Sequence, residues 1–393
     1  ETHGPETHEI TVRANDLHDR PCTVEREFAV GDSPRGVAVG DLNEDGLIDL
    51  VFTNDRSLSV MLATGEDLWG LKRDFPVTSS LRSVNLADVN ADGHVDAIVS
   101  GQNYHSVSVL LGFGDGTVSP STEYSVGRRS RCGMGCIPDG AVATGDIDAD
   151  GDLDIIAGKS LDGDVTVLLN DGYGYFPLSL NYPVDGPYML YDLDVGDLNG
   201  DSRLDVVVAH GSRILVMLGN GDGTLQPAAV LGIHWATNAD VGDVNRDGNN
   251  DIVMLNHDEV DVLLGYGNGS FAPRLSTSHG LINHRITNFV LKDLNGDGSL
   301  DAIGTADFVS DLLIVLPGNG DGTFQSEKVY AVTEYPTACI IADFNEDGKK
   351  DLGVSGWASN VISILLGNGD NTFQSATLYP TRNSPTSLAE GHF

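Results

Sequence analysis

The sequence is poor in positive charge and in long apolar segments. Its 393 residues include 22 lysines and arginines against 58 aspartates and glutamates, a formal net charge of −36 at pH 7. A surface this negative repels nucleic acids and anionic lipids, so we expect neither as a partner. No apolar run approaches the roughly 18–20 residues that span a bilayer, so we also expect no membrane insertion.

Cysteine is scarce as well, with four residues in the chain, too few for a fold that depends on disulfides. Cys132 and Cys136 lie in a glycine- and arginine-rich insertion, where a small-loop disulfide is predicted if the protein is extracellular. A zinc site there would need two more ligands, and none lies beside it. Cys22 and Cys339 are either a second disulfide or two buried thiols.

The residues that are abundant indicate a β-rich fold. Apolar residues make up 40 % of the chain, enough for a substantial core. The 48 glycines and 15 prolines, with little helical periodicity, predict many short strands joined by tight turns. Because the chain begins with Glu1 rather than methionine, we expect a processed product from which any secretion signal has been removed.

One nine-residue acidic pattern occurs seven times. The copies are DLNEDGLID at 41, DVNADGHVD at 88, DIDADGDLD at 146, DLNGDSRLD at 197, DVNRDGNND at 243, DLNGDGSLD at 293 and DFNEDGKKD at 343. They start 47, 58, 51, 46, 50 and 50 residues apart. A period near 50 residues predicts a repeat architecture.

Each period contains the same order of elements. An apolar segment such as 35–40 precedes the acidic loop, and second and third apolar segments such as 49–52 and 106–112 follow it. A glycine turn, fullest at 318–324, then leads to a fourth segment such as 324–332. Gly-Asp-Gly and Gly-Asn-Gly suit hairpin turns, so we interpret this second motif as a turn rather than a ligand site.

Four antiparallel strands repeated seven times predict an all-β, seven-bladed β-propeller, with the acidic loop between strands 1 and 2 of each blade. A linear β-solenoid is the main alternative, but it usually has shorter repeats and capped ends, and neither end resembles a cap. We predict an N-terminal extension at 1–24, a tether or an exchanged strand, and a propeller at 25–393. The predicted blades are about 33–79, 80–137, 138–186, 187–233, 234–283, 284–335 and 336–384, with an extra first strand at 385–393.

The two ends contain surplus strand-like segments. Residues 384–393 match the first strand at 33–42, and residues 23–34 match fourth strands, while 9–16 alternates like a further strand. One explanation is that a terminal strand completes the ring within one molecule. The other is that a terminal strand pairs with a neighbouring molecule, head to tail, and builds filaments. Deletion of residues 1–24 would distinguish them.

The acidic loop has the chemistry of a calcium site. Positions 1, 3, 5 and 9 are Asp, Asn or Asp, Asp and Asp in every copy, and position 6 is glycine in six of seven. Calcium takes six to eight oxygen ligands, including carboxylate, amide and backbone carbonyl oxygens. Zinc prefers histidine or cysteine, and magnesium resists full dehydration. Because position 9 is Asp and no glutamate follows at 12, the loop is not an EF-hand.

The predicted ligands are the residues at positions 1, 3, 5, 7 and 9, with position 7 contributing its backbone carbonyl, for up to seven Ca²⁺ ions. They are Asp41, Asn43, Asp45, Leu47 and Asp49; Asp88, Asn90, Asp92, His94 and Asp96; Asp146, Asp148, Asp150, Asp152 and Asp154; Asp197, Asn199, Asp201, Arg203 and Asp205; Asp243, Asn245, Asp247, Asn249 and Asp251; Asp293, Asn295, Asp297, Ser299 and Asp301; and Asp343, Asn345, Asp347, Lys349 and Asp351. The copy at 197–205 departs most from the pattern, because Ser202 replaces the glycine.

With these seven loops and the G-N-G-D-G-T-F turn, the chain from about residue 25 to its end resembles the FG-GAP, or VCBS-type, repeat family, which includes the integrin α-subunit propellers. The resemblance implies calcium ligation at Asp41, Asn43, Asp45 and Asp49 and at their equivalents. It also implies a secreted or surface-exposed propeller that serves in adhesion, in glycan binding or as a module of secreted enzymes. The fold alone does not give the function.

The remaining residues favour a non-catalytic role. The sequence has no H-E-x-x-H, G-x-S-x-G or phosphate-loop motif. Trp69, Trp235 and Trp357 occupy different places in their repeats, which argues against identical sugar pockets. We expect an extracellular interaction, adhesion or assembly module that binds a protein, a glycan or its own copies. The alternatives are a lectin with one pocket and a polysaccharide-acting enzyme or its accessory module. Asn268 begins the sequence's N-glycosylation sequon.

Overall fold

The computed structural model describes residues 14–15, 21–22, 36–54, 56–64, 70, 72–78, 81–101, 106–126, 141–158, 164–184, 190–211, 213–232, 238–255, 259–278, 286–306, 311–345, 347–356, 361–380 and 387–390. Regular structure in these residues consists of β-strands. The strands form seven sheets of four consecutive antiparallel strands, one of which gains a fifth strand, and a separate two-stranded pair. No helix among the described residues is long and apolar enough to cross a membrane.

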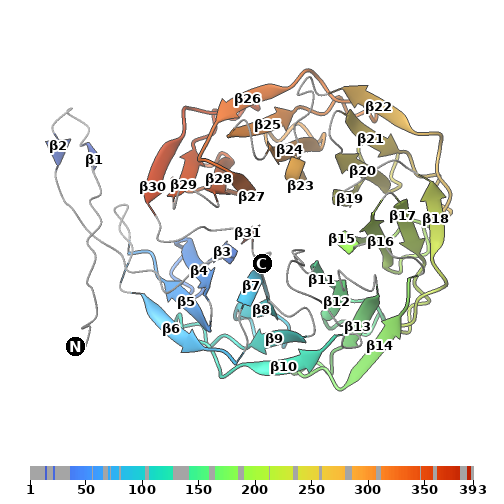
Figure 1. Ribbon diagram of the computed structural model, residues 1–393, viewed down its shortest axis with the longest axis horizontal. Helices are drawn as coiled ribbons and strands as arrows, with labels where there is room; N and C mark the ends of the chain where they lie inside the picture. The colour runs from blue at the N-terminus through green and yellow to red at the C-terminus, as the bar shows by residue number, and fades with distance from the viewer. Residues whose placement is uncertain are drawn as a thin grey trace, which may run out of the picture.

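The seven sheets stand around a central axis as the blades of a propeller, which confirms the predicted fold (Figure 1). Blade 1 consists of β3 (Gly36–Gly40), β4 (Asp49–Thr53), β5 (Ser57–Met61) and β6 (Arg73–Pro76). Blade 2 consists of β7 (Leu81–Ala87), β8 (Asp96–Gly101), β9 (Ser106–Leu110) and β10 (Thr122–Ser125), and blade 3 of β11 (Val142–Gly145), β12 (Asp154–Gly158), β13 (Val165–Leu169) and β14 (Leu178–Tyr182). Blade 4 consists of β15 (Leu190–Gly196), β16 (Asp205–His210), β17 (Arg213–Met217) and β18 (Ala229–Gly232).

Blades 5 to 7 repeat this order. They are β19 (Asn238–Gly242), β20 (Asp251–Leu255), β21 (Glu259–Leu263) and β22 (Leu275–Ser278); β23 (Ile286–Lys292), β24 (Asp301–Ala306), β25 (Leu312–Leu316) and β26 (Lys328–Ala331); and β27 (Pro336–Ala342), β28 (Asp351–Gly356), β29 (Val361–Leu365) and β30 (Thr377–Pro380). The first strand of each blade lies nearest the axis and the fourth lies at the rim (Figure 1).

The burial of the strands follows from this arrangement. All six residues of β8, β16 and β24 are buried, because both faces of a middle strand pack against neighbouring blades. The outer strands β18 and β22 are mostly exposed. The middle strands therefore have short continuous apolar sequences, in contrast to the alternating pattern of a sheet with one face in water.

Apolar side chains fill the spaces between blades, and each fully buried Val, Leu or Ile contributes about 1.5–3 kcal/mol. One such cluster joins Leu58 and Val60 of blade 1 to Leu81 of blade 2, and others follow around the ring. The last cluster packs Phe52 of blade 1 against Ile340 of blade 7. The ring is therefore closed by side-chain packing between its first and last blades.

The C-terminal segment adds a backbone link to this closure. β31 (Ser387–Glu390) pairs with β3 in parallel, with Ala38 opposite Ala389, and also contacts β27 and β7. The sequence predicted this segment as an extra first strand, which would begin an antiparallel sheet. Instead it covers the inner edge of blade 1, where an innermost strand has unpaired backbone groups.

Part of the predicted N-terminal extension is also a strand pair. β1 (Ala14–Asn15) pairs with β2 (Pro21–Cys22) in antiparallel fashion. The match of 23–34 to a fourth strand lies outside the described residues, as do Cys132 and Cys136 of the predicted disulfide. Cys339 is a buried thiol rather than half of a disulfide, and burial raises its pKa to about 12. The second of the two alternatives for this cysteine, a buried thiol, is therefore the one observed.

Carboxylates connect the inner strands of three consecutive blades. Each accepts the backbone N–H of a strand in the next blade: Asp192 from Ala239 at 3.2 Å, Asp194 from Val241 at 2.8 Å and Asp240 from Leu291 at 3.0 Å. These contacts satisfy N–H groups that have no strand partner on the axial side. Burial raises the pKa of all three carboxyls, that of Asp192 to about 7.

Candidate calcium loops

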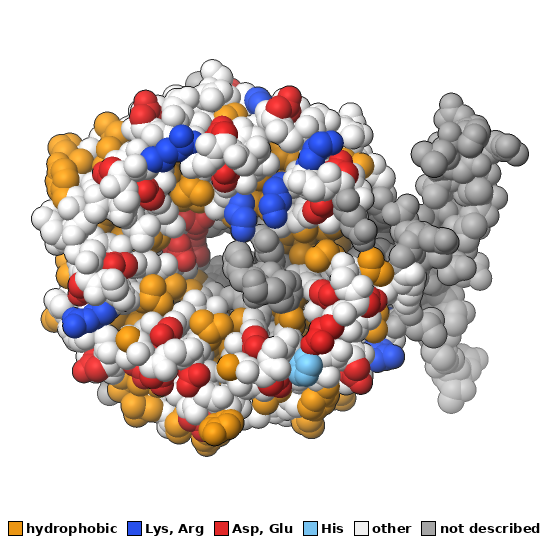
Figure 2. Space-filling view, turned by 180° about the vertical axis from the view of Figure 1, so that it is seen from behind, with side chains coloured by type: hydrophobic (Ala, Val, Ile, Leu, Met, Phe, Trp, Pro, Cys, Tyr) orange, Lys and Arg blue, Asp and Glu red, His pale blue; other side chains and the backbone are white. Residues whose placement is uncertain are grey.

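The seven acidic loops each connect the first strand of a blade to the second. Loop positions 1 to 9 are counted here from the first aspartate, so loop 1 is 41–49 and loop 6 is 293–301. Acidic side chains lie on every side of the central opening in Figure 2. Each blade of the propeller thus carries one cluster of carboxylate and amide oxygen atoms.

The position-9 aspartates are the buried base of the loops. All seven are 0 % exposed: Asp49, Asp96, Asp154, Asp205, Asp251, Asp301 and Asp351. One carboxylate oxygen accepts the N–H of loop position 2, at 2.8–3.0 Å. The other accepts an N–H just beyond the third strand, at 2.6–2.8 Å. This residue therefore joins the loop to strands 1 and 3 of its blade.

In five blades, the residue that donates its N–H to the position-9 aspartate from just beyond the third strand is glycine. Gly318 illustrates why a side chain does not fit there. A Cβ at Gly318 would lie 2.2 Å from the carbonyl oxygen of Leu300, a distance that a real Cβ does not tolerate. Gly318 also begins the G-N-G-D-G-T-F segment, in which the Asn319 N–H donates to the Thr323 carbonyl and Asp321 accepts the Thr323 N–H. The segment is thus a turn, as its glycines predicted.

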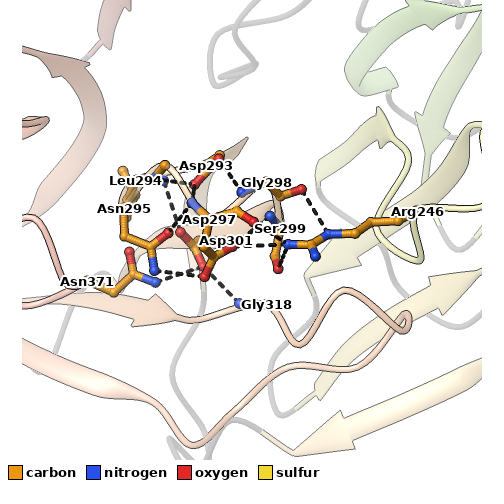
Figure 3. Close-up of polar contacts among 11 residues, drawn as sticks. Arg246, Asp293, Leu294, Asn295, Asp297, Gly298, Ser299, Asp301, Gly318 and Asn371 are labelled. Carbon is orange, nitrogen blue, oxygen red and sulfur yellow. Dashed lines mark hydrogen bonds and ion pairs between the residues drawn. The ribbon is translucent and has the colours of Figure 1, made fainter.

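Positions 1, 3 and 5 hold the loop in a bend by hydrogen bonds to its own backbone, shown for loop 6 in Figure 3. Asp293 accepts the N–H of Gly298 at 2.7 Å and that of Asp297 at 3.2 Å. The Asn295 side-chain amide donates to Asp297 at 2.9 Å, and Asp297 accepts the Ser299 N–H at 2.7 Å. The same three side chains that were predicted as ligands therefore shape the loop.

A second left-handed residue, at position 4, was not expected from the sequence. Glycine at position 6 has positive φ, and so have the position-4 residues Glu44 (φ 59°), Ala91 (54°), Ala149 (61°) and Arg246 (60°). Side chains other than glycine adopt this conformation at a cost. Position 4 varies between Glu, Ala, Arg and Gly, so its sequence gives no signal of the conformation.

Loop 4, the least regular copy, keeps the geometry of the others. Ser202 adopts φ 64° in place of glycine, and its N–H donates to Asp197 at 2.7 Å. The Arg203 N–H donates to Asp201 at 3.0 Å, as position 7 does to position 5 in loop 6. The substitution at position 6 therefore strains loop 4 without changing its fold.

Loop 3 tests whether the donor set fits a cation. It is the copy with Asp rather than Asn at position 3, and Oδ1 of Asp148 is buried with no hydrogen-bond partner. Carboxylate oxygens of Asp146, Asp148 and Asp154 lie within 4.8 Å of one another. Three carboxylates this close repel each other unless a cation lies among them.

The protonation equilibria of position 9 point to the same need for positive charge. The pKa of Asp96 is raised to about 7 and that of Asp49, Asp154 and Asp251 to about 6, chiefly by burial. Charged aspartates of the same loop add to this rise: those at positions 1 and 5 in loops 1, 2 and 5, and those at positions 3 and 5 in loop 3. A cation among these groups favours their charged forms.

The donor set fits calcium. It offers only oxygen atoms, from carboxylates and from an amide, which are the ligands of a hard cation. Positions 1, 3, 5 and 9 would hold the ion, and the position-7 carbonyl remains a predicted ligand. When bound, the ion would neutralise the carboxylates that otherwise repel each other.

The next blade contacts four of the loops from the side. Backbone N–H groups in the glycine turns of blades 2, 5 and 6 donate to the position-2 carbonyl of the preceding loop: Gly116 to Leu42 at 3.0 Å, Gly269 to Leu198 at 3.1 Å and Gly322 to Val244 at 3.1 Å. In blade 3 the side-chain amide of Asn170 makes the equivalent contact with Val89. The turn motif thus couples loops 1, 2, 4 and 5 to the next blade.

The remaining predicted sites have mixed outcomes. Asn268 is exposed in its turn and accepts the Ser270 N–H at 3.0 Å. Trp69, Trp235 and Trp357 lie outside the described residues. Exposed aromatic residues that the sequence analysis did not single out lie in the turns of blades 2, 3 and 5: Phe113 (56 % exposed), Tyr173 (80 %), Tyr175 (53 %) and Tyr266 (59 %).

Comparison with protein families identifies the repeat. A family model described as FG-GAP-like repeat matches residues 41–99, 88–157, 146–208, 197–254, 243–304 and 293–354. Each match begins at the first aspartate of one acidic loop and ends in the second strand of the next blade. A search of curated proteins gave no match.

Solved structures share the fold at low sequence identity. One is a lectin from Agrocybe aegerita that recognises non-reducing terminal N-acetylglucosamine: it is 20 % identical, with a TM-score of 0.60 over 88 % of this chain and 94 % of that one. Another is BBS1N in complex with ARL6DN, soaked with lead: it is 13 % identical, with a TM-score of 0.55 over 83 % of this chain and 90 % of that one. These similarities concern the fold.

Proposed function

Because the chain belongs to the FG-GAP-like repeat family, we propose that it is an extracellular, calcium-stabilised β-propeller that binds a protein or glycan partner and catalyses no reaction. The observation that carries the calcium part is the buried, unpartnered oxygen of Asp148 among the carboxylates of loop 3. An extracellular location suits such sites, because calcium modules outside cells work with dissociation constants of about 10⁻⁴–10⁻³ M.

Equilibrium dialysis against calcium tests this function. We expect the full chain to bind several calcium ions, up to seven, with magnesium at the same concentration displacing few of them. Asp148→Asn should retain loop 3 binding, because asparagine is the residue of the other six loops, whereas Asp154→Ala should remove one ion. A chain that binds no calcium would contradict the proposal.

The binding role is supported by the exposed, variable turns that a rigid propeller presents, since partners usually bind at such loops. The lectin of similar fold binds N-acetylglucosamine and BBS1N binds ARL6DN, so propellers of this shape accommodate both kinds of partner. A polysaccharide-acting enzyme remains the third hypothesis, and assays on acidic polysaccharides would detect it.

A glycan partner is the second candidate, and the exposed aromatic rings favour it. Tyr173 and Tyr175 lie in one turn of blade 3, and the ring of Tyr175 is 6.0 Å from that of Tyr124 in blade 2. Phe113 lies in the turn of blade 2. Exposed aromatic rings suit the apolar faces of sugars, and the tyrosine hydroxyls suit the hydroxyls of sugars.

A glycan array with the full chain tests this candidate. We expect Tyr173→Ala to weaken binding at least about tenfold, the effect of losing one well-placed ring contact. Tyr266→Ala, an equally simple change in the turn of blade 5, should leave binding unchanged. Absence of binding to any glycan would favour a protein partner instead.

Self-assembly through the terminal strands stays a prediction. β31 pairs with β3 of its own chain, which supports closure within one molecule for the C-terminal segment. Exchange would therefore have to involve the N-terminal segment, and the size of the particles before and after deletion of residues 1–24 would decide it.

A further inference from the structure

We propose that basic side chains divide the seven loops into two classes of calcium affinity, with weaker binding at loops 4, 6 and 7. The inference rests on the proposed function, because it presupposes that the loops bind calcium. It concerns the position-5 aspartate, which is an expected ligand in every loop and accepts an N–H bond from position 7.

In the three loops of the weaker class, a lysine or arginine forms an ion pair with the carboxylate of the position-5 aspartate. Arg203 is 3.6 Å from Asp201 in loop 4, and Lys349 is 3.1 Å from Asp347 in loop 7. Both basic residues occupy position 7 of their own loop. In loop 6 the cation comes from the preceding loop, because Arg246 is 3.2 Å from Asp297.

The contact of Arg246 is the most extensive of the three (Figure 3). Its guanidinium donates to the backbone carbonyl of Asp297 at 2.8 Å and to that of Gly298 at 3.0 Å, and it also contacts the Ser299 hydroxyl. Asn371 of blade 7 approaches the loop from the opposite side and donates to Asp301 at 3.0 Å. Loop 6 is therefore held by both neighbouring blades.

The contact between loops starts from the left-handed position 4. Arg246 occupies position 4 of loop 5, and the residue in the same place in loop 1, Glu44, contacts His94 of loop 2. Position 4 of one loop thus meets position 7 of the next. Where position 4 is glutamate, it adds a negative charge beside the next loop, and where it is arginine, it adds a positive one.

In the part of the chain that the structure describes, the other four loops have no such cation. Among the described residues, no lysine or arginine pairs with Asp45, Asp92, Asp150 or Asp247, the position-5 aspartates of loops 1, 2, 3 and 5. Calcium entering loops 4, 6 and 7 must displace a positive charge from a ligand or bind beside it. Arg203, Arg246 and Lys349 are 49 %, 45 % and 44 % exposed, so water and salt weaken the repulsion.

Calcium titration of the full chain by calorimetry tests the inference. We expect four ions to bind more tightly than the other three, with an affinity ratio of about three- to tenfold for partly exposed charges. Arg203→Gln, Arg246→Gln and Lys349→Gln should each move one ion from the weaker to the tighter class. Glu44→Gln should weaken one ion of the tighter class.

Lys72→Gln is the matched control, because it removes the same charge from a pair with Asp74 on the outer strand of blade 1. It should leave both classes unchanged. Raising the salt concentration should bring the two classes together, which a purely structural role of the three residues would not do. Seven bound ions whose affinities do not respond to Arg203→Gln, Arg246→Gln or Lys349→Gln would overturn the inference but not the proposed function. No bound calcium at all would overturn both.

Discussion

Removal of calcium with EGTA should lower the melting temperature of the protein by about 15 °C. A ligand that binds only the folded state stabilises it by about 2.7 kcal/mol per site at a hundredfold excess over its dissociation constant. Several sites act on one closed ring, and about 1 kcal/mol changes the melting temperature of a large domain by a degree or more. The emptied loops would also leave like charges close together, as in Asp146, Asp148 and Asp154.

Differential scanning calorimetry after thorough dialysis against EGTA measures this effect. Calcium added in excess should restore the original melting temperature, and magnesium should restore little of it, because it resists full dehydration in an all-protein loop. A melting curve that EGTA does not change would show that the loops are held by their own hydrogen bonds alone.

Much of the fold could be predicted because the repeat carries its own signals. The acidic loop fixes where strand 1 ends and strand 2 begins, and the glycine turn marks the way to strand 4, so even the blade of loop 4 was placed despite Ser202. The seven copies of the acidic loop, spaced by about 50 residues, then predicted seven blades of four strands each. These signals are local, and the acidic loop is repeated seven times.

Most of the contacts that the sequence did not predict lie between blades. Arg246 and Asp297 are 51 residues apart, and Glu44 and His94 are 50 apart, so no short motif connects them. The parallel pairing of β31 with β3 depends on which edge is free once the ring has closed. A pattern that resembles a first strand identifies a strand but not its partner or its direction.

The position-9 aspartate should be the residue whose loss costs the fold most, with or without calcium. Asp301 is 0 % exposed and accepts three hydrogen bonds, from the N–H groups of Leu294 and Gly318 and from the side chain of Asn371. Asp301→Ala would leave these donors buried without an acceptor, at about 1–3 kcal/mol each. We therefore expect the free energy of unfolding to fall by about 3–5 kcal/mol in EGTA.

Asp297→Ala in the same loop is the matched comparison, because the Asp297 side chain is 49 % exposed. In EGTA it should cost less than about 1 kcal/mol, since water can replace the lost contacts. In calcium both variants should lose the contribution of one site as well, so the difference between them should persist. Urea denaturation of the two variants, in EGTA and in calcium, measures all four values. Equal losses in EGTA would show that Asp301 serves the cation alone and that the blade does not depend on its hydrogen bonds.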